Sequence, residues 1–518
     1  MPYDYAPFPY ARAPGLDAPE PRHPVVIVGA GPIGLAFALE LANHGTPSVL
    51  LDDDDTVSVG SRAICWSKRS LEIMERLGTG DLNVGRRAAA KGVGWKVGRT
   101  FRGEAQVFEF DLLPEEGHRF PAFVNLQQYW VEQYMAEAAL AEPLCDIRFR
   151  SRVTALEDRG DHVALTVETP DGTYALEAGH VVASDGARSP IRRMMGLRLA
   201  GEAFDERFLI ADIEMRSDFP PERRFWFEPT FHPGQSALMH RQPDDIYRID
   251  LQLGPDADPE REAREEVVRP RIERVVGHGD FRLDWVSVYS FRCQRLERFV
   301  HGRVVFAGDS AHVVSPFGAR GGNGGLQDVD ALGWRLARVA NGADPSILAA
   351  YDRERVFASD ENIAHSARAT RFMTPEPGAE RRYRDAVLHL AGRADFARPL
   401  VNSGRLSTPC VYPSGGPDDP SLPEASRPGA VAPDAPLRDG WLQPLLAGRF
   451  TVLGVGCAAP EVEGAEALEI PAEGAVAARY LGDAPSALYL LRPDQVVAAR
   501  WREADAVEVR AALDGALS

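Results

Sequence analysis

Apolar positions near the start of the chain predict a buried strand that leads into a helix. Residues 25–28 are an uninterrupted run of β-branched side chains, which is typical of a strand covered on both faces. Residues 35–43 are mostly apolar and predict a helix, and residues 48–51 form a second strand-like run. Short apolar runs and helical patterns then alternate to about residue 372, which predicts an α/β domain.

A different pattern occupies residues 201–290, which are richer in extended segments with aromatic side chains. Along residues 246–253 apolar and polar side chains alternate, as in an antiparallel strand with one covered face. Residues 242–245, Gln-Pro-Asp-Asp, are typical of a turn and predict a hairpin whose first strand is residues 235–241. We expect residues 92–111 to add strands to the same sheet.

Beyond residue 372 the pattern weakens before a small α/β unit begins. Pro, Gly, Ser and Asp accumulate over residues 373–436, which predicts a linker interrupted by a helix at residues 381–392. We expect residues 437–518 to form a separable domain. Its predicted elements are a strand at 450–455, a hairpin of 487–491 and 496–501 around a turn at 492–495, and an amphipathic helix at 504–517.

Length and charge narrow the functional classes. A chain of 518 residues is too long for one hydrophobic core, so several domains are expected. The net charge of −18 argues against nucleic acid and anionic membranes as partners, and no apolar run is long enough to span a bilayer. Residues 1–24 form an extension that lacks the features of a secretory signal. The five scattered cysteines form no C-x-x-C pair, so we expect no metal site and a cytoplasmic location.

A glycine-rich motif joins the first strand to the first helix and indicates a dinucleotide-binding loop. Gly29 permits the tight turn, Gly31 lets a pyrophosphate approach the backbone, and Gly34 allows close helix–strand packing. Asp52 ends the second strand 18 residues after Gly34, where a carboxylate can bond ribose hydroxyls. The alternative is a glycine-rich turn that binds no nucleotide. The motif consists of Gly29, Ala30, Gly31, Pro32, Ile33 and Gly34.

Two later segments suggest a ligand longer than one nucleotide. Asp185-Gly follows one strand-like run, and Gly308-Asp309 follows another. A glycine-rich loop over residues 316–325 then opens a helix at residues 326–339, and such a loop is again an anion cradle. Because these segments lie far along the chain from the first motif, one extended ligand that contacts both is the simplest account.

The three motifs, in this order, resemble those of the single-component (group A) FAD-dependent aromatic monooxygenases, the para-hydroxybenzoate hydroxylase family. The resemblance covers residues 25–372 and is closer to the phenol hydroxylase and 3-(3-hydroxyphenyl)propionate hydroxylase branch. It implies an α/β fold with a Rossmann-like FAD-binding domain over residues 25–200 and 291–372. It also implies an inserted, mainly antiparallel substrate domain over residues 201–290, with strands from about 92–111, and a thioredoxin-like domain over residues 437–518. The lone Cys457 supplies no dithiol there, so that domain is expected to be structural.

The resemblance also assigns roles to residues along the cofactor. Asp52 is expected on the adenosine ribose, Val153 at the adenine, and Gln128 and Asp309 near the ribityl chain. Arg320 is expected to carry a charge that helps flavin reduction; the alternative is a surface salt bridge. The residues implied to bind FAD are Gly29, Ala30, Gly31, Pro32, Ile33, Gly34, Asp52, Arg62, Gln128, Val153, Asp185, Gly308, Asp309, Pro316, Gly318, Gly321, Gly322 and Asn323.

Fewer residues can be assigned to the substrate. A phenol needs a partner that takes up its proton, and Tyr247 and His240 on the predicted hairpin are our first candidates. Arg320 and Pro316 complete the predicted catalytic set. Residues 225–227, Phe-Trp-Phe, either line an aromatic pocket or pack in the core. His312 is expected to be a packed residue and not a catalyst.

These expectations combine into a hydroxylase. The resemblance implies that NADH or NADPH binds transiently and reduces FAD, and that O2 adds at the flavin C4a as a hydroperoxide that hydroxylates a phenolic or other electron-rich aromatic substrate. A homodimer is possible in this family. Two alternatives remain: an FAD-binding protein without oxygenase activity, and a flavin halogenase, whose W-x-W-x-I-P segment the tryptophans, including Trp95 and Trp226, do not supply.

Overall fold

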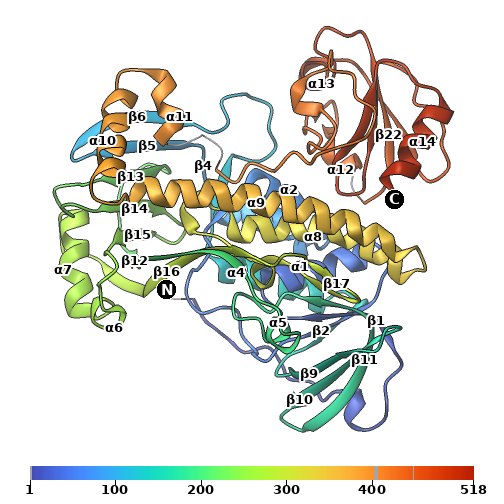
Figure 1. The fold of residues 1–518 in the computed structure, drawn as a ribbon, viewed down its shortest axis with the longest axis horizontal. Coiled ribbons are helices and arrows are strands. Elements are labelled where there is room, and N and C mark those ends of the chain that lie inside the picture. Colours follow the sequence, from blue (N-terminus) through green and yellow to red (C-terminus); the bar gives the residue numbers. More distant parts are fainter. Residues whose placement is uncertain (1–2, 402–405, 447, 518) are drawn as a thin grey trace.

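A computed structural model describes residues 3–401, 406–446 and 448–517. It has three parts (Figure 1). A parallel sheet and an antiparallel sheet lie side by side, and the long helix α9 (Leu348–Met373) runs across both of them. The C-terminal unit, residues 437–517, sits at one end of this helix. Among the described residues, no helix is both long and apolar enough to cross a membrane.

The first sheet has a parallel core in which β1 (His23–Val28) lies at the centre, as its buried β-branched run predicts. Helix α1 (Pro32–Asn43) follows β1 and is buried on nearly every side because it packs between the sheet and helix α8 (Gly321–Ala340). The prediction of an α/β domain is confirmed. The other strands are β2 (Ser48–Leu51), β8 (Cys145–Arg148), β11 (Gly172–Ala183), β18 (Val304–Phe306) and β17 (Val300–His301), with the hairpin β9 (Arg152–Asp158) and β10 (Val163–Thr169) attached to β11.

A small three-stranded sheet links the two large sheets. Its strands are short, and Ser67 caps the helix that follows the first of them by accepting a hydrogen bond from Ser70 N–H. The strands are β3 (Cys65–Ser67), β7 (Phe123–Asn125) and β4 (Val93–Trp95), and the adjoining helices are α2 (Lys68–Glu75), α3 (Val84–Lys91) and α4 (Gln128–Leu140).

The second large sheet has eight strands, and nearly all of its neighbouring strands are antiparallel. The predicted hairpin is present, with a turn in which Asp244 and Asp245 have positive φ. Residues 92–111 contribute two strands, as expected. Strand β16 extends five residues past the predicted boundary at 290. The strands are β5 (Val97–Arg102), β6 (Ala105–Asp111), β12 (Ala200–Glu214), β13 (Arg223–Phe227), β14 (Ser236–Arg241), β15 (Ile246–Gln252), β16 (Arg282–Arg295) and β19 (His312–Val313).

Helices cover both faces of this sheet. On one face, α7 (Glu265–Val276) packs against alternate residues of the central strands, and α6 (Pro259–Glu262) precedes it. On the other face lies the end of α9, followed by α10 (Ala379–Ala391) and α11 (Arg398–Val401). Helix α10 begins two residues before the predicted helix at 381–392 and ends one residue earlier.

The C-terminal unit has a mixed four-stranded sheet in the order β23-β22-β24-β25. The predicted strand and hairpin are β22 (Thr451–Val455), β24 (Ala487–Leu491) and β25 (Val497–Trp501), and the predicted last helix is α14 (Ala506–Ala516). A capping box of Asp505 and Glu508 fixes the start of α14. Strand β23 (Glu466–Ile470) and helix α13 (Gly474–Tyr480) were not predicted from the sequence; the unit also contains α12 (Gln443–Leu446), β20 (Pro436–Leu437) and β21 (Gly440–Trp441).

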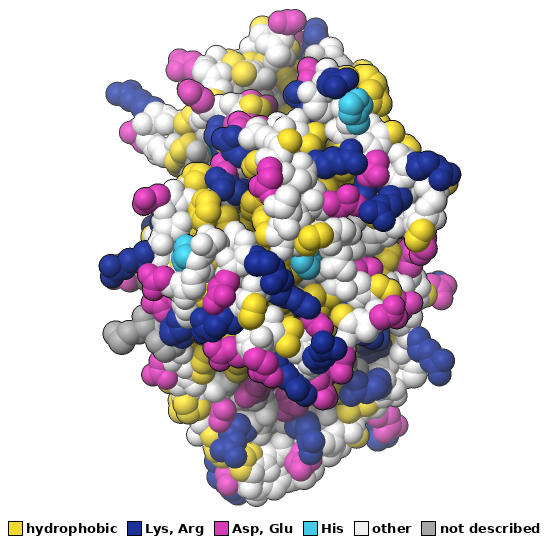
Figure 2. Space-filling model, turned by 90° about the vertical axis from the view of Figure 1, so that its left-hand side faces the viewer, with side chains coloured by type: hydrophobic (Ala, Val, Ile, Leu, Met, Phe, Trp, Pro, Cys, Tyr) yellow, Lys and Arg dark blue, Asp and Glu magenta, His cyan; other side chains and the backbone are white. Residues whose placement is uncertain are grey.

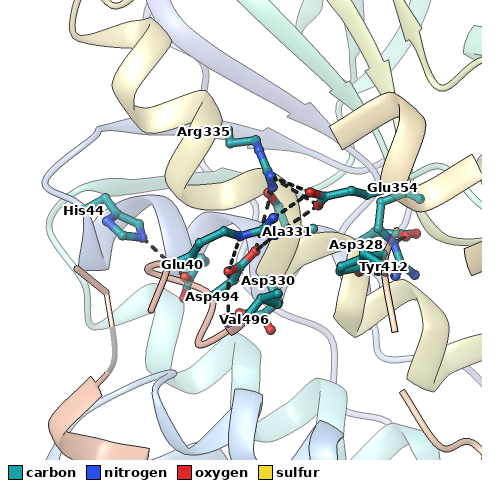
Figure 3. Close-up of polar contacts among 12 residues, drawn as sticks. Glu40, His44, Asp328, Asp330, Ala331, Arg335, Glu354, Tyr412, Asp494 and Val496 are labelled. Atoms are coloured by element: carbon teal, nitrogen blue, oxygen red, sulfur yellow. Dashed lines mark hydrogen bonds and ion pairs between the residues drawn. The ribbon is translucent and has the colours of Figure 1, made fainter. Parts of the chain in front are cut away.

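The turn between β24 and β25 docks the C-terminal unit on the helices of the first domain. Figure 3 shows its Asp494 near Arg335 of α8 and Glu354 of α9. Arg492 in the same turn donates to both carboxylate oxygens of Glu354 at 2.5 and 3.0 Å. Arg69 of α2 donates to the side chain of Gln495 at 2.7 Å. The predicted turn is therefore present and is buried in a network of charges.

Candidate functional site

The glycine motif forms the turn between β1 and α1, and the structure explains each glycine separately. Gly29 has φ of +104°, and a Cβ there would lie 2.6 Å from the Ser184 carbonyl oxygen. A Cβ at Gly34 would overlap the Gly29 carbonyl. At Gly31 a Cβ would meet no protein atom within 4 Å, so the backbone faces open space at the N-terminus of α1. This is the arrangement that a pyrophosphate needs.

Asp52 lies at the end of β2 and holds the glycine turn in place. Its carboxylate accepts hydrogen bonds from the backbone N–H of Ala30 and, at 2.8 Å, of Asp54. Burial raises the pKa of Asp52 to about 6. Pro32 is the first residue of α1, and the next residue, Ile33, packs against Gly308, which brings the first and third motifs together.

The second and third motifs contribute two more carboxylates. Asp185 Oδ2 accepts a hydrogen bond from Ile191 N–H at 2.9 Å, whereas its buried Oδ1 has no partner among the described residues. Burial raises the pKa of Asp185. Asp309 stays accessible to solvent, although protein atoms crowd it closely enough that desolvation raises its pKa. An unpartnered acceptor and an accessible carboxylate beside the open space at Gly31 fit an extended ligand that carries hydroxyl and phosphate groups.

The loop before α8 is tied to the small sheet by Asn323. The amide oxygen of Asn323 accepts from Ser67 N–H at 2.9 Å, and its amide nitrogen donates to the Cys65 carbonyl at 2.8 Å. The side chain is therefore committed to the protein, and only the backbone of this residue is left to face a ligand. Pro316 is exposed, Gly318 is buried, and Gly321 and Gly322 are half-buried in the first turn of α8.

Arg320 is buried at the head of α8, with an exposed fraction of 4%. Its Nη1 donates to the side-chain oxygen of Asn362 on α9 at 2.8 Å. The alternative of a surface salt bridge does not fit this burial. The side chain lines the pocket described below.

Arg62, Gln128 and Val153 come from separate parts of the chain and differ in exposure. Arg62 is exposed and has φ of +43°. Its carbonyl accepts a hydrogen bond from Arg248 of β15 at 2.6 Å, so the antiparallel sheet holds this turn. Gln128 accepts from Ala63 N–H at 3.2 Å, and Val153 is buried in β9.

The two predicted proton acceptors lie on opposite faces of the antiparallel sheet. Tyr247 is fully buried on the face covered by α7, and its hydroxyl donates to the Ser217 carbonyl at 3.2 Å. His240 pairs with Arg248 in the register and therefore faces the other side. Burial lowers the pKa of His240 well below its ordinary value, so the ring is neutral, and its buried Nδ1 has no partner among the described residues. The structure does not bring Tyr247 and His240 together.

A pocket with about 790 Å³ of empty space lies between the His240 face of this sheet and the end of α9. Phe225 and Phe227 line it, whereas Trp226 stacks on Phe101 on the other face. Both readings of the Phe-Trp-Phe segment are thus correct for different residues. The lining residues are Arg99, Thr100, Phe110, Arg223, Phe225, Phe227, Phe317, Gly318, Arg320, His365, Arg368, Ala369, Phe372, Met373, Pro399, Leu400, Val401 and Leu406.

A buried network that the sequence analysis missed supports the third motif. His312 Nε2 lies 2.7 Å from Asp328 Oδ2, which also accepts a hydrogen bond from Gly308 N–H at 2.8 Å. Arg355 of α9 donates to the other oxygen of Asp328 at 2.6 Å and to the hydroxyl of Tyr412 at 2.8 Å. His312 therefore packs and positions, as expected. In the sequence, the only indication that Asp328 belongs to a buried network is its position as an acidic residue within a largely apolar helix.

Comparisons with known proteins agree with this geometry. Residues 22–366 match the family model described as FAD binding domain. A flavin-dependent monooxygenase of Mycobacteroides abscessus is 30% identical over 353 residues, which are 64% of this chain and 71% of that protein. A 12-dehydrotetracycline 5-monooxygenase/anhydrotetracycline 6-monooxygenase of Streptomyces rimosus is 29% identical over 506 residues, 91% of this chain and 94% of that protein. The crystal structure of the flavin-dependent monooxygenase PieE with FAD and substrate has a TM-score of 0.78 at 22% identity and covers 96% of this chain and 100% of its own.

The family match covers about two thirds of the chain. It includes the glycine turn at Gly29–Gly34, the Asp185 and Asp309 motifs and the loop at the head of α8, which are the segments that the structure gathers along one side of the parallel sheet. The chain belongs to the FAD-binding-domain family of flavin-dependent aromatic monooxygenases, and FAD is its cofactor.

Proposed function

We propose that this enzyme uses NADH or NADPH and O2 to hydroxylate a phenolic or other electron-rich aromatic substrate in the pocket beside α9. One observation carries the proposal: Phe317, Gly318 and Arg320, from the loop that heads the flavin-binding helix, also line the phenylalanine-rich pocket. A substrate there would lie next to the cofactor. Related proteins named as anhydrotetracycline, 3-(3-hydroxyphenyl)propionate and para-nitrophenol monooxygenases or hydroxylases support an aromatic substrate.

The residues of this chain would then have distinct tasks. The Gly29–Gly34 turn, Asp52 and Asp309 would hold FAD, which when bound supplies the redox chemistry and the reaction with O2. The phenylalanine walls exclude water from the reacting ring. The N-terminus of α8 and the Arg320 charge stabilise negative charge next to the loop. His240 lies on the face of the sheet that bounds the pocket but is not one of its lining residues; its ring is neutral, and its lowered pKa suits Nδ1 to accept a hydrogen bond but not to take up a proton.

The decisive experiment is a substrate screen with the FAD-loaded protein. Oxidation of NADH or NADPH, followed at constant O2, should be stimulated by phenols, hydroxyphenyl acids or larger aromatic hydroxyl compounds, with a hydroxylated product in stoichiometric yield. A flavoprotein that binds FAD only as a structural or sensory group would show no stimulation by any of them.

We also infer that residues 437–518 form a thioredoxin-like domain. A parallel pair, β22 and β23, followed by the antiparallel hairpin β24–β25 and the helices α13 and α14 supports this assignment. A loop, residues 456–465, connects the parallel strands and carries Cys457, whose thiol donates to the Ala487 carbonyl at 3.5 Å. A structural role for this unit agrees with the docking of its turn on α8 and α9.

A further inference from the structure

The charged side chains that line the pocket are all basic. Four arginines and one histidine line it together with five phenylalanines, whereas none of its described lining residues is Asp or Glu. The chain as a whole is acidic, with 76 Asp and Glu against 58 Lys and Arg, so chance would favour the opposite sign. Figure 2 shows positive and negative side chains interspersed over one face of the molecule. The basic lining is therefore not the continuation of a basic surface on that face.

Three of the four arginines have partners or lie at the rim. Arg99 pairs with Glu222 at 2.9 Å and with Glu109 at 3.0 Å, so protein carboxylates balance its charge. Arg320 is held by Asn362, as described above. Arg368 is exposed, and its Nη2 lies 3.4 Å from the Pro399 carbonyl. None of these three is arranged primarily to receive a ligand inside the pocket.

Arg223, at the start of β13, differs from them. Within the described part of the chain its guanidinium makes no hydrogen bond and no ion pair, and its Nε is buried without a partner. Alternation along β13 places it on the same face as Phe225 and Phe227. The neighbouring side chains on that face balance its charge only in part: His240 is uncharged, and Asp250, which acts on Arg223 without forming an ion pair with it, has a pKa that burial raises to about 7.

We infer that the pocket takes an aromatic substrate that carries a negative charge, and that Arg223 binds this charge. The inference rests on the proposed function, because it names the substrate class of the same pocket. Arg223 is half-buried and its guanidinium has no hydrogen-bonded acceptor among the described residues, so an anionic oxygen of the ligand would satisfy its donors and help to balance its charge. A carboxylate and an ionised acidic hydroxyl both supply such an oxygen.

Binding to the FAD-loaded protein without NADH or NADPH tests this inference separately from turnover. The probes are 3-hydroxy-2-naphthoate and its neutral amide, 3-hydroxy-2-naphthamide, titrated while flavin absorbance and fluorescence are recorded. Because a hydrogen bond to a charged group contributes more than a neutral one, we expect the acid to bind at least about tenfold more tightly. Arg223→Met should remove this preference, and Arg223→Lys should retain part of it.

Arg224→Met is the matched control. Arg224 is the next residue of β13 but points to the other face, where its Nε donates to Glu222 at 2.7 Å. This variant should keep the preference for the acid, and the flavin content and circular dichroism of all variants show that they are folded. Comparison of 1-nitro-2-naphthol, ionised at pH 8, with 2-naphthol shows whether an acidic hydroxyl replaces the carboxylate.

Equal affinity of the parent for the acid and the amide, including failure of both to bind at millimolar concentration, would overturn the inference. So would a preference that survives Arg223→Met unchanged. The proposed function fails by a different result, namely that no phenol stimulates NADH or NADPH oxidation. If the protein hydroxylates neutral phenols and binds the acid and the amide equally well, the proposed function stands and the anionic substrate class is refuted.

Discussion

Replacing Arg492 by methionine tests whether the C-terminal unit is an integral part of the flavin-binding core. Arg492 bridges Glu354 of α9 and Asp494 of its own turn, with N–O distances of 2.5 to 3.0 Å. The side chains of Arg492 and Asp494 are 9% and 2% exposed, so solvent screens their interaction little. Methionine fills a similar volume and removes the charge.

The expected loss in the free energy of unfolding follows from the carboxylates that Arg492→Met leaves without their partner. Removal of one partner from a buried ion pair costs about 3–5 kcal/mol, because the remaining carboxylate stays buried without compensation. Here Arg335 remains 3.1 Å from Glu354 and 3.8 Å from Asp494 and offsets part of the cost. We therefore expect the lower end of the range, about 3 kcal/mol, which at roughly 2 °C per kcal/mol is a fall of about 6 °C in the first thermal transition.

The pH dependence of stability offers a second readout of the same contact. Burial alone would raise the pKa of Asp494 and Glu354, but the Arg492 charge outweighs burial and lowers both. Carboxyl groups with lowered pKa values stabilise the fold above the pKa of the unfolded chain, about 4, and lose this contribution as the pH falls below it. The parent should therefore lose stability more steeply on acidification than Arg492→Met.

Differential scanning calorimetry and urea titration of the FAD-loaded proteins provide the assay. Arg502→Met is the control, since Arg502 is about half exposed and lies 3.8 Å from Asp419; it should cost less than about 1 kcal/mol. Adding Glu354→Gln to Arg492→Met should recover part of the loss, because the uncompensated charge is removed. If Arg492→Met and Arg502→Met are equally stable, the docking network does not hold the unit in place.

Three further predictions concern the cofactor and the tail. Gly31→Val should fold normally, because a Cβ there meets no protein atom, yet purify without flavin; a yellow protein with stoichiometric FAD would refute the role of this turn. Arg320→Met should lower the flavin midpoint potential by the equivalent of roughly 1–3 kcal/mol and slow reduction by NADH or NADPH, whereas an unchanged potential would show that its charge does not act on the flavin. Truncation after residue 428 leaves Arg69 and Glu354 without their partners in the turn, so the remaining core should melt at lower temperature; a core of unchanged melting temperature and flavin content would instead support a separable tail.

Local sequence patterns were sufficient to predict secondary structure where the backbone conformation itself is constrained. The run before Gly29 and the spacing of the glycines predicted β1, the turn and α1, because a closely packed strand–turn–helix tolerates few other residues. The hairpin of β14 and β15 was likewise evident from its turn. The face of the sheet on which Tyr247 or His240 lies could not be predicted in the same way. It depends on the register between the strands and on α7, which covers one face of the sheet.

Long-range contacts explain the remaining differences. Strand β23 has three exposed residues, with only Leu468 half-buried and Ile470 buried, and is only five residues long, so its sequence resembles a loop. Arg223 carries no local signal either, because its importance comes from the lack of a hydrogen-bonded acceptor on a sheet assembled from distant segments. The turn at residues 492–495 has the composition of a surface turn and is buried only because it meets α2, α8 and α9.

Helix α9 connects these distant features physically. Near its start, Glu354 and Arg355 contact the C-terminal unit and the linker; near its end, Arg368 and Phe372 line the pocket. Figure 1 shows α9 running from the C-terminal unit to the antiparallel sheet. Arg355 also reaches Asp328, which holds the Gly308 N–H directly before Asp309, a residue that we propose binds FAD. Because these ion pairs and hydrogen bonds are buried, we expect a displacement of the tail to shift the Gly308–Asp309 segment as well. The tail, the Gly308–Asp309 segment and the pocket wall are therefore all linked to one helix, α9.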